Sequence, residues 1–253
     1  MSYVYILTIV VVGLSGIIAQ ALLLRELLVS FYGNELILGL ILGNWVASEA
    51  LGAFLSGKYI DRIKNKVNVL VIFQLIFSLM LPIAIYFTRV SKAAAGFSFG
   101  EAVGLYNIFY LSFLIIFPVS FCHGALFSLS CKILNSIGKA YTWETIGTIL
   151  GGVILTYILL PFLSSLQIAA LILVLNLVVC WFLAKGKTIA LRYTALVFLF
   201  TVCVLAFSGN LEKLERLSVQ KQWKAQEVLD YRNSVYGNIT VTKKENQYTF
   251  FYN

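Results

Sequence analysis

A carboxylate in the middle of an apolar segment is the feature of this chain that comes closest to chemistry. Glu49 lies inside the apolar run 36–60. A charged side chain at that depth in a membrane is costly unless it is neutral, paired or facing a polar cavity. Two interpretations are therefore open for Glu49. It either hydrogen-bonds a neighbouring helix, or it binds a cation in a ligand site with Asn44, Ser48, Glu144 and Asn176.

Other polar residues within or beside apolar runs have simpler interpretations. His123, the only histidine of the chain, follows Pro118 in an apolar run and can either relay protons or hydrogen-bond across helices. The four cysteines show no CxxC spacing, so neither a disulfide framework nor a metal site is indicated. We expect three residues near the ends of the first two apolar runs to form ion pairs at the membrane interface: Arg25, Glu26 and Glu35.

Composition places this chain in a membrane. Its 253 residues are 60% hydrophobic and only 12% charged, whereas soluble domains are roughly half apolar. Apolar runs long enough to cross a hydrocarbon core of about 30 Å occur seven times. They cover residues 3–24, 36–60, 67–87, 104–129, 146–163, 166–184 and 189–207. We therefore predict an all-α polytopic bundle of about seven transmembrane helices within residues 1–207.

Small residues at helical spacing predict close contacts between these helices. Gly39, Gly43 and Ala47 recur every four residues in the second run, beside a stripe of small or polar residues that ends at Ser56. Gly147 and Gly151 repeat the pattern in the fifth run. Both patterns are explained by packing without any function.

The net charge of +8 is distributed asymmetrically over the loops. No nucleic-acid-binding motif accompanies it, so lipid headgroups are the expected counter-charge and nucleic acid is not an expected partner. The positive-inside rule favours a cytoplasmic N-terminus, with cytoplasmic loops at 61–66 and 185–188. One side holds Arg62, Lys64, Lys66, Lys132, Lys139, Lys185, Lys187 and Arg192, and the other only Arg25, Arg89 and Lys92.

Residues 208–253 have a different character. Leu211, Leu214 and Leu217 predict an amphipathic helix at the membrane surface or a solvated linker helix. Beyond it, alternating residues of 239–242 and 248–252 predict a β-hairpin with its turn at 243–247. Because an isolated hairpin is marginally stable, we expect this segment to be the truncated start of a larger β domain.

These segments resemble a known family. The run WKAQEVLDYRNSVYGNITVTKKENQYTFFYN (223–253) is similar to the linker and first strands of the spermidine/spermine synthases, in the form fused to an N-terminal membrane region. Residues 13–62 and 141–161 are similar to membrane segments of that fused family. GKYIDRIKNK (57–66) also resembles the loop between helices two and three of major facilitator transporters, although Lys64 replaces a preferred glycine. That likeness implies a bundle resembling half a facilitator.

The resemblance implies aminopropyl transfer from decarboxylated S-adenosylmethionine in a complete family member. Ser234, Tyr236, Gly237, Asn238 and Ile239 match the first-strand pattern, but Gly237 stands where soluble members commonly carry glutamine. The nucleoside site and catalytic acids are expected beyond residue 253. This chain is accordingly predicted to have no catalytic residue, to hold no cofactor and to be inactive alone.

Three functions remain open. The leading one is a multi-pass module of the inner (plasma) membrane that anchors a separate or downstream synthase domain and handles polyamine, a chain of ammonium groups suited to the Glu49 site. The others are a facilitator-like small-molecule transporter and a purely structural anchor. One conflict stays open as well. Seven spans place the C-terminal segment outside, whereas an S-adenosylmethionine derivative is cytoplasmic, so either 189–207 does not fully span or the domain is not an ordinary aminopropyltransferase.

Overall fold

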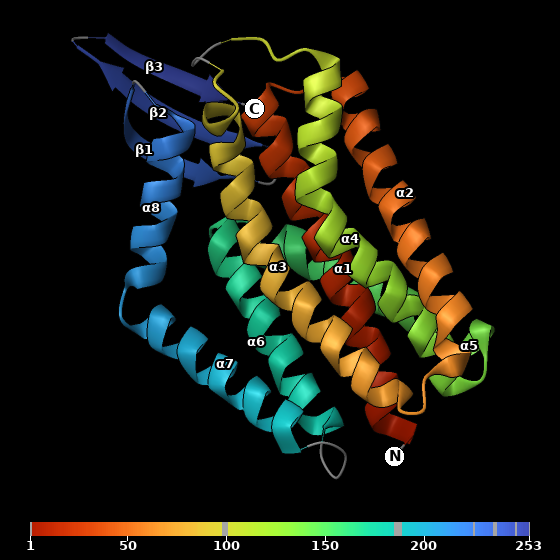
Figure 1. Cartoon of the computed structure of the whole chain (residues 1–253). Helices are drawn as coiled ribbons and strands as arrows, with labels where there is room; N and C mark the ends of the chain where they lie inside the picture. Colours follow the sequence, from red (N-terminus) through yellow and green to blue (C-terminus); the bar gives the residue numbers. More distant parts are fainter. Residues whose placement is uncertain are drawn as a thin grey trace.

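Seven long helices dominate the described part of the chain (Figure 1). The computed structural model describes residues 2–97, 101–184, 189–224, 226–234, 237–245 and 247–252. Each of the seven is long and apolar enough to cross a membrane, which confirms the predicted multi-pass helical architecture. The helices are α1 (Ser2–Phe31), α2 (Glu35–Tyr59), α3 (Lys66–Ala94), α4 (Leu105–Leu134), α5 (Ile137–Ile154), α6 (Ser165–Leu183) and α7 (Ile189–Phe207).

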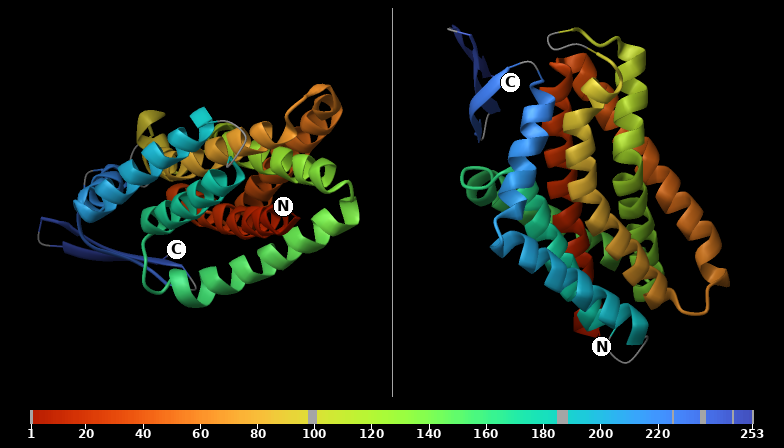
Figure 2. Two further views of the ribbon diagram at one scale, coloured as in Figure 1. Left: turned by 90° about the horizontal axis from the view of Figure 1, so that it is seen from below. Right: turned by 60° about the vertical axis from the view of Figure 1, so that its left-hand side comes forward.

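Helix α1 forms the centre of the bundle. It packs against α3, α4, α5 and α6, and the view along the bundle in Figure 2 shows it surrounded by them. Its side chains at Ile18, Leu22, Leu23 and Leu27 are fully buried, as expected for a helix with neighbours on several sides. Helix α7 is peripheral, packs mainly on α6 and leads into α8 (Asn210–Gln222).

A small antiparallel sheet follows α8 at the end of the bundle opposite the N-terminus (Figure 1). Its strands are β1 (Glu227–Asn233), β2 (Asn238–Lys244) and β3 (Gln247–Tyr252), in the order β1-β2-β3. The predicted hairpin is confirmed, since Ile239 pairs with Tyr252 and Val241 with Phe250. Strand β1 is an addition to the predicted pair. Asn246 of the predicted turn lies outside the described residues, as does the predicted cytoplasmic loop 185–188.

The sheet turns its polar face inward. Asn238, Thr240 and Thr242 of β2 are buried, whereas Phe250 and Tyr252 of β3 are 73% and 65% exposed. This is the reverse of an antiparallel sheet packed on a hydrophobic core. Phe251 shares the inward face, and its ring centroid lies 4.7 Å from that of the buried Trp223. Polar contacts and this aromatic pair therefore hold the sheet together.

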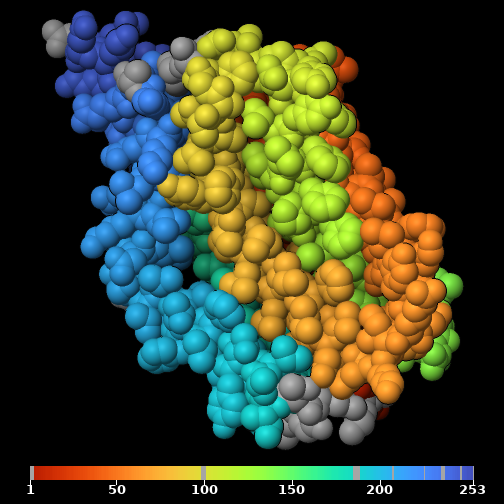
Figure 3. Space-filling model, in the orientation of Figure 1, coloured from red at the N-terminus to blue at the C-terminus, as the bar shows by residue number. Residues whose placement is uncertain are grey.

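Helix α8 is held in the same way. Leu214 and Leu217 of the predicted apolar face are exposed, whereas Ser218 and Val219 are buried. Figure 3 shows α8 and the sheet, in blue, at one end of the molecule beside α3, in yellow, and α8 contacts α3 and the start of α6. The outward leucines suit a helix that borders lipid, because they add apolar surface there.

Glycines allow the close helix contacts α2–α4 and α1–α5. The sequence predicts some of these glycines and misses others. A Cβ on Gly124 of α4 would clash with the carbonyl oxygen of Glu49 on α2. Gly147 and Gly151 of α5 meet α1 in the same way, as predicted. The prediction for Gly39 and Gly43 is wrong: both lie on an exposed face of α2, and a Cβ there would meet nothing within 4 Å.

Three charges that the sequence analysis assigned to loops lie inside helices. Arg25 belongs to α1, and Arg89 and Lys92 belong to α3, because both helices extend several residues beyond their apolar runs. The loops at the sheet end, 32–34, 95–104 and 160–164, consequently contain no Lys or Arg at all. At the opposite end, Lys66, Lys132, Lys139 and Arg192 lie inside helices as well. The asymmetry therefore favours a cytoplasmic N-terminus no more strongly than the sequence alone does.

The glycine contact between α2 and α4 gives a test by substitution. Gly124→Ala should destabilise the bundle by about 1–3 kcal/mol, because the added methyl group overpacks the contact with the Glu49 backbone. Gly39→Ala is the matched control and should leave the thermal melting temperature in detergent unchanged or slightly higher, since alanine is the better helix former. Equal melting temperatures for the two variants would contradict the α2–α4 contact.

The topology can be tested by labelling single cysteines. With the four native cysteines replaced by alanine, Asn65→Cys should resist an impermeant thiol reagent in intact cells, whereas Lys244→Cys should react. Both positions are exposed and lie at opposite ends of the bundle. Labelling after membrane permeabilisation controls for folding. Protection of Lys244→Cys with labelling of Asn65→Cys would reverse the orientation.

Candidate functional site

The predicted ligand residues on α2 face α4. The Asn44 Nδ2 donates to the Phe109 carbonyl oxygen at 3.0 Å and to the Ser112 Oγ at 2.8 Å. Ser48 is fully buried, and its hydroxyl has no hydrogen-bond partner among the described residues. Asn44 thus links α2 to α4, and its amide nitrogen already donates to α4.

Glu49 is paired on both carboxylate oxygens. Its Oε2 accepts from the Trp45 Nε1 at 2.8 Å, and its Oε1 lies 2.7 Å from the His123 Nδ1 of α4. The His123 side chain is 7% exposed and that of Glu49 31%. The histidine that the sequence left without a partner is therefore the partner of the mid-span carboxylate.

The two remaining predicted residues lie on different helices. Glu144 of α5 is close enough to Glu49 and His123 for their charges to interact. Asn176 of α6 belongs to another network, in which it accepts from the Gln74 Nε2 at 3.0 Å and donates to the Ser15 Oγ at 2.8 Å. The structure thus brings Glu49 near Glu144 but gives Asn44 and Asn176 partners of their own.

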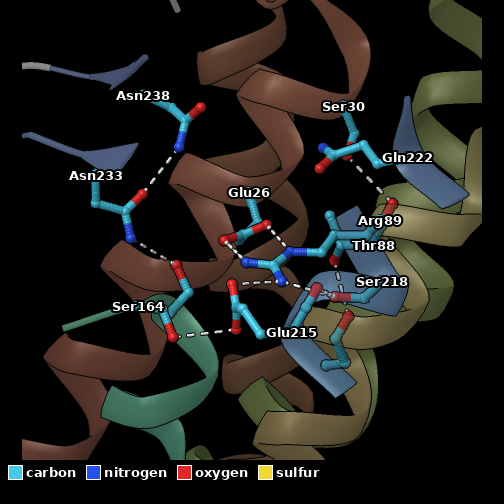
Figure 4. A network of polar contacts seen from close by, with 12 residues as sticks. Glu26, Ser30, Thr88, Arg89, Ser164, Glu215, Ser218, Gln222, Asn233 and Asn238 are labelled. Atoms are coloured by element: carbon cyan, nitrogen blue, oxygen red, sulfur yellow. Dashed lines mark hydrogen bonds and ion pairs between the residues drawn. The ribbon is translucent and has the colours of Figure 1, made fainter. Parts of the chain in front are cut away.

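A second polar cluster, centred on Arg89, is shown in Figure 4. The Arg89 guanidinium donates from Nε and Nη2 to the two oxygens of Glu26, both at 2.8 Å. Its Nη1 lies 2.7 Å from the Glu215 Oε1 and donates to the Ser218 Oγ at 2.8 Å. Side chains of α1, α3 and α8 therefore meet on one arginine that is 1% exposed.

The electrostatics of this cluster depend on burial. Burial raises the pKa of Glu215 above its ordinary value, against the opposing effect of the Arg89 charge. Burial also raises the pKa of Tyr231, whose ring lies 5.5 Å from the Arg89 guanidinium, so the phenol stays neutral. The planar guanidinium donates two parallel hydrogen bonds to the Glu26 carboxylate, and a lysine ammonium could not form such a bidentate pair.

Neighbouring hydrogen bonds extend the cluster to the sheet. The Glu215 Oε2 accepts from the Ser164 hydroxyl, which caps α6, at 3.1 Å. The Arg25 Nη2 donates to the backbone oxygens of Ser234 at 2.6 Å and Gly237 at 3.1 Å, on the two sides of the β1–β2 connection. The Gln222 amide donates to the Ser30 hydroxyl at 3.0 Å. Helix α8 and the sheet are thus tied to α1, α3 and α6.

Sequence reasoning found one member of this cluster. It predicted ion pairing for Arg25, Glu26 and Glu35, of which the structure pairs Glu26 with Arg89. Arg25 instead donates to backbone oxygens at the β1–β2 connection of the sheet. Sequence reasoning assigned Arg89 to a loop. An arginine flanked by a long apolar run is the signal that could have revealed it, because such a charge requires a buried partner. The identity of that partner, 63 residues away in the chain, follows only from the three-dimensional structure.

Comparisons with known proteins give no relative. No model of a protein family matches the chain, and neither a curated protein nor a solved structure is similar to it.

The Arg89 cluster predicts a large loss of stability on breaking the buried pair. Arg89→Met should cost about 3–5 kcal/mol, because it leaves the Glu26 carboxylate buried without its cation. Arg232→Met removes an exposed ion pair with Asp230 and is the matched control, with little expected change. Melting temperatures in detergent measure both. The double variant Glu26→Gln with Arg89→Met should recover part of the loss, and no recovery would contradict direct pairing.

Proposed function

We propose that this chain is a membrane module that anchors a spermidine-synthase-like domain at the inner (plasma) membrane. The observation that carries the proposal is the attachment of α8 and the sheet to three helices of the bundle through the Arg89 cluster and Arg25. A purely flexible tether needs no buried charges. Such charges fix a defined orientation, because they are satisfied only when each partner is in place.

The outer face of the sheet supports a role in presenting a further layer of protein. Ile239, Tyr248, Phe250 and Tyr252 share this face and are all exposed. An apolar face of a three-stranded sheet gains stability when another element covers it, and sheets in compact domains are normally covered. The family resemblance of residues 223–253 supplies the identity of the proposed domain, which would bring the decarboxylated S-adenosylmethionine site and the catalytic acids.

Polyamine handling has weaker support than anchoring. The Asn176 Oδ1 accepts from Gln74, and both oxygens of Glu49 have protein partners. A site for a chain of ammonium groups needs unengaged acceptors that converge. Anchoring is accordingly the proposed role, and spermidine binding through these five residues is not part of it.

A facilitator-like transporter is the second candidate. One observation favours it: Glu49 and His123 place an ionisable pair at mid-depth in the helices, where transporters keep such groups. The anchoring role does not require this pair, since it lies away from α8 and the sheet.

The anchoring proposal is tested on the native protein. The chain is purified from its own membranes with an antibody against the loop 61–66, and the product is analysed by mass spectrometry and assayed with decarboxylated S-adenosylmethionine and putrescine. We expect residues 223–252 to continue into, or to co-purify with, a polypeptide that carries a glycine-rich nucleoside site. Its absence would refute the proposal. Aminopropyl transfer by the product would identify an ordinary synthase, and a nucleoside-binding product without transfer would identify a synthase-like fold with another substrate.

A further inference from the structure

The imidazole of His123 occupies a closed position between four helices. Its Nδ1 faces Glu49 of α2, and the rings of Trp45 and Phe77 lie with their centroids 6.4 and 5.9 Å from its own. Its Nε2 faces the backbone of α1, where it makes no hydrogen bond of normal geometry. Glycine at position 16 makes this arrangement possible, because a Cβ there would clash with the Nε2.

The charged groups around His123 are both acidic. Glu49 on α2 and Glu144 on α5 interact with it, while the facing parts of α1 and α3 contribute Gly16 and Phe77, which carry no charge. Within the described residues, one imidazole therefore stands against two carboxylates. Burial disfavours a charged imidazole, but opposite charges attract more strongly in a low-dielectric interior than in water, so the Glu49 carboxylate in contact with the ring offsets the cost of burying an imidazolium.

A groove at the N-terminal end of the bundle begins one helical turn from the pair. It has a volume of about 580 Å³ and lies between α2, α4 and the start of α5. Its lining residues Ala53 and Phe127 are one helical turn from Glu49 and His123, and it continues to Asn135 in the α4–α5 turn. That turn is at the N-terminal end of the bundle (Figure 1). Toward the sheet end, the buried Trp45 and Asn44 fill the space beside the pair.

We propose that Glu49 and His123 form an intramembrane proton-binding site that exchanges its proton with water at the N-terminal end of the bundle. In the loaded form the imidazolium donates its Nδ1 proton to the Glu49 Oε1. On release, the Nδ1 proton passes through the Glu49 carboxylate to water in the groove, and the neutral imidazole keeps its other proton on Nε2, which faces α1. The ligand is the proton itself. The site is independent of the proposed anchoring function, since it shares no residue with the Arg89 cluster.

The single histidine makes this inference directly measurable. Protein labelled only with ¹⁵N-histidine and reconstituted in lipid bilayers gives one imidazole signal set, whose ¹⁵N shifts distinguish imidazolium from either neutral tautomer. We expect imidazolium at pH 7 and conversion to the neutral ring at higher pH. Glu49→Gln should give the neutral ring at pH 7, because the paired charge is gone while shape and hydrogen bonding remain. Glu35→Gln, on the same helix but at its exposed start, should behave as wild type.

Two outcomes would overturn the proposal. A neutral imidazole at pH 7 in wild type, unchanged in Glu49→Gln, would make the contact an ordinary hydrogen bond. Where Glu49→Gln fails to fold, the wild-type signal alone decides: a neutral imidazole at pH 7 overturns the proposal. Sidedness is tested in oriented vesicles with different pH on the two sides: the imidazole should follow the pH at the N-terminal end, and a response to the sheet end alone would refute the groove as the path.

Discussion

A single buried guanidinium determines how the two parts of this molecule are joined. Arg89 is 1% exposed and lies near the end of α3, so its charge must be compensated by neighbours and not by water. Glu26 comes from α1 and Glu215 from α8, and each satisfies a different edge of the guanidinium. Separating α1 from α3 would leave Glu26 and Arg89 without each other, and moving α8 away would remove both partners of the Arg89 Nη1. The position of α8, and through it of the sheet, depends on this constraint.

Apolar packing could not supply the same constraint. The surrounding helices are uniformly apolar, and in lipid a leucine gains little by exchanging acyl chains for another helix. The bundle is consequently specified by contacts of two other kinds. Glycines allow backbones to approach at Gly124 and Gly147, and buried polar side chains such as Asn176 pair across helices. The inward polar face of β2 follows the same logic, because it meets a polar cluster and not an apolar core.

The sequence predicts the elements that depend on local residue patterns. It does not predict which face of each helix contacts the neighbouring helices. Hydropathy identified the seven helices, because span length is fixed by bilayer thickness, and alternation identified the two strands β2 and β3, which extend into the predicted turn 243–247. The sequence misplaced Arg89 and assigned helix contact to Gly39. A glycine repeat looks the same on either side of a helix, and only the neighbouring helices decide which side is buried. For the same reason, Glu49 could be recognised as a paired residue without its partner His123.

The two ionisable clusters of this protein share a helix but not a role. Glu26 and Gly16 both lie on α1, separated by about 15 Å along its axis. Glu26 gives the Arg89 cluster, which holds α8 and the sheet, a carboxylate. Gly16 has no side chain and so leaves room for the His123 imidazole. The Arg89 cluster has one permanently charged cation, itself 1% exposed, between two carboxylates, which suits permanent attachment. The His123 pair has a titratable cation, and a groove begins one turn away. The two clusters therefore differ because arginine keeps its charge, whereas histidine can gain and lose a proton. Arg89 fixes a charge at the sheet end, and His123 carries an exchangeable proton in the middle of the bundle.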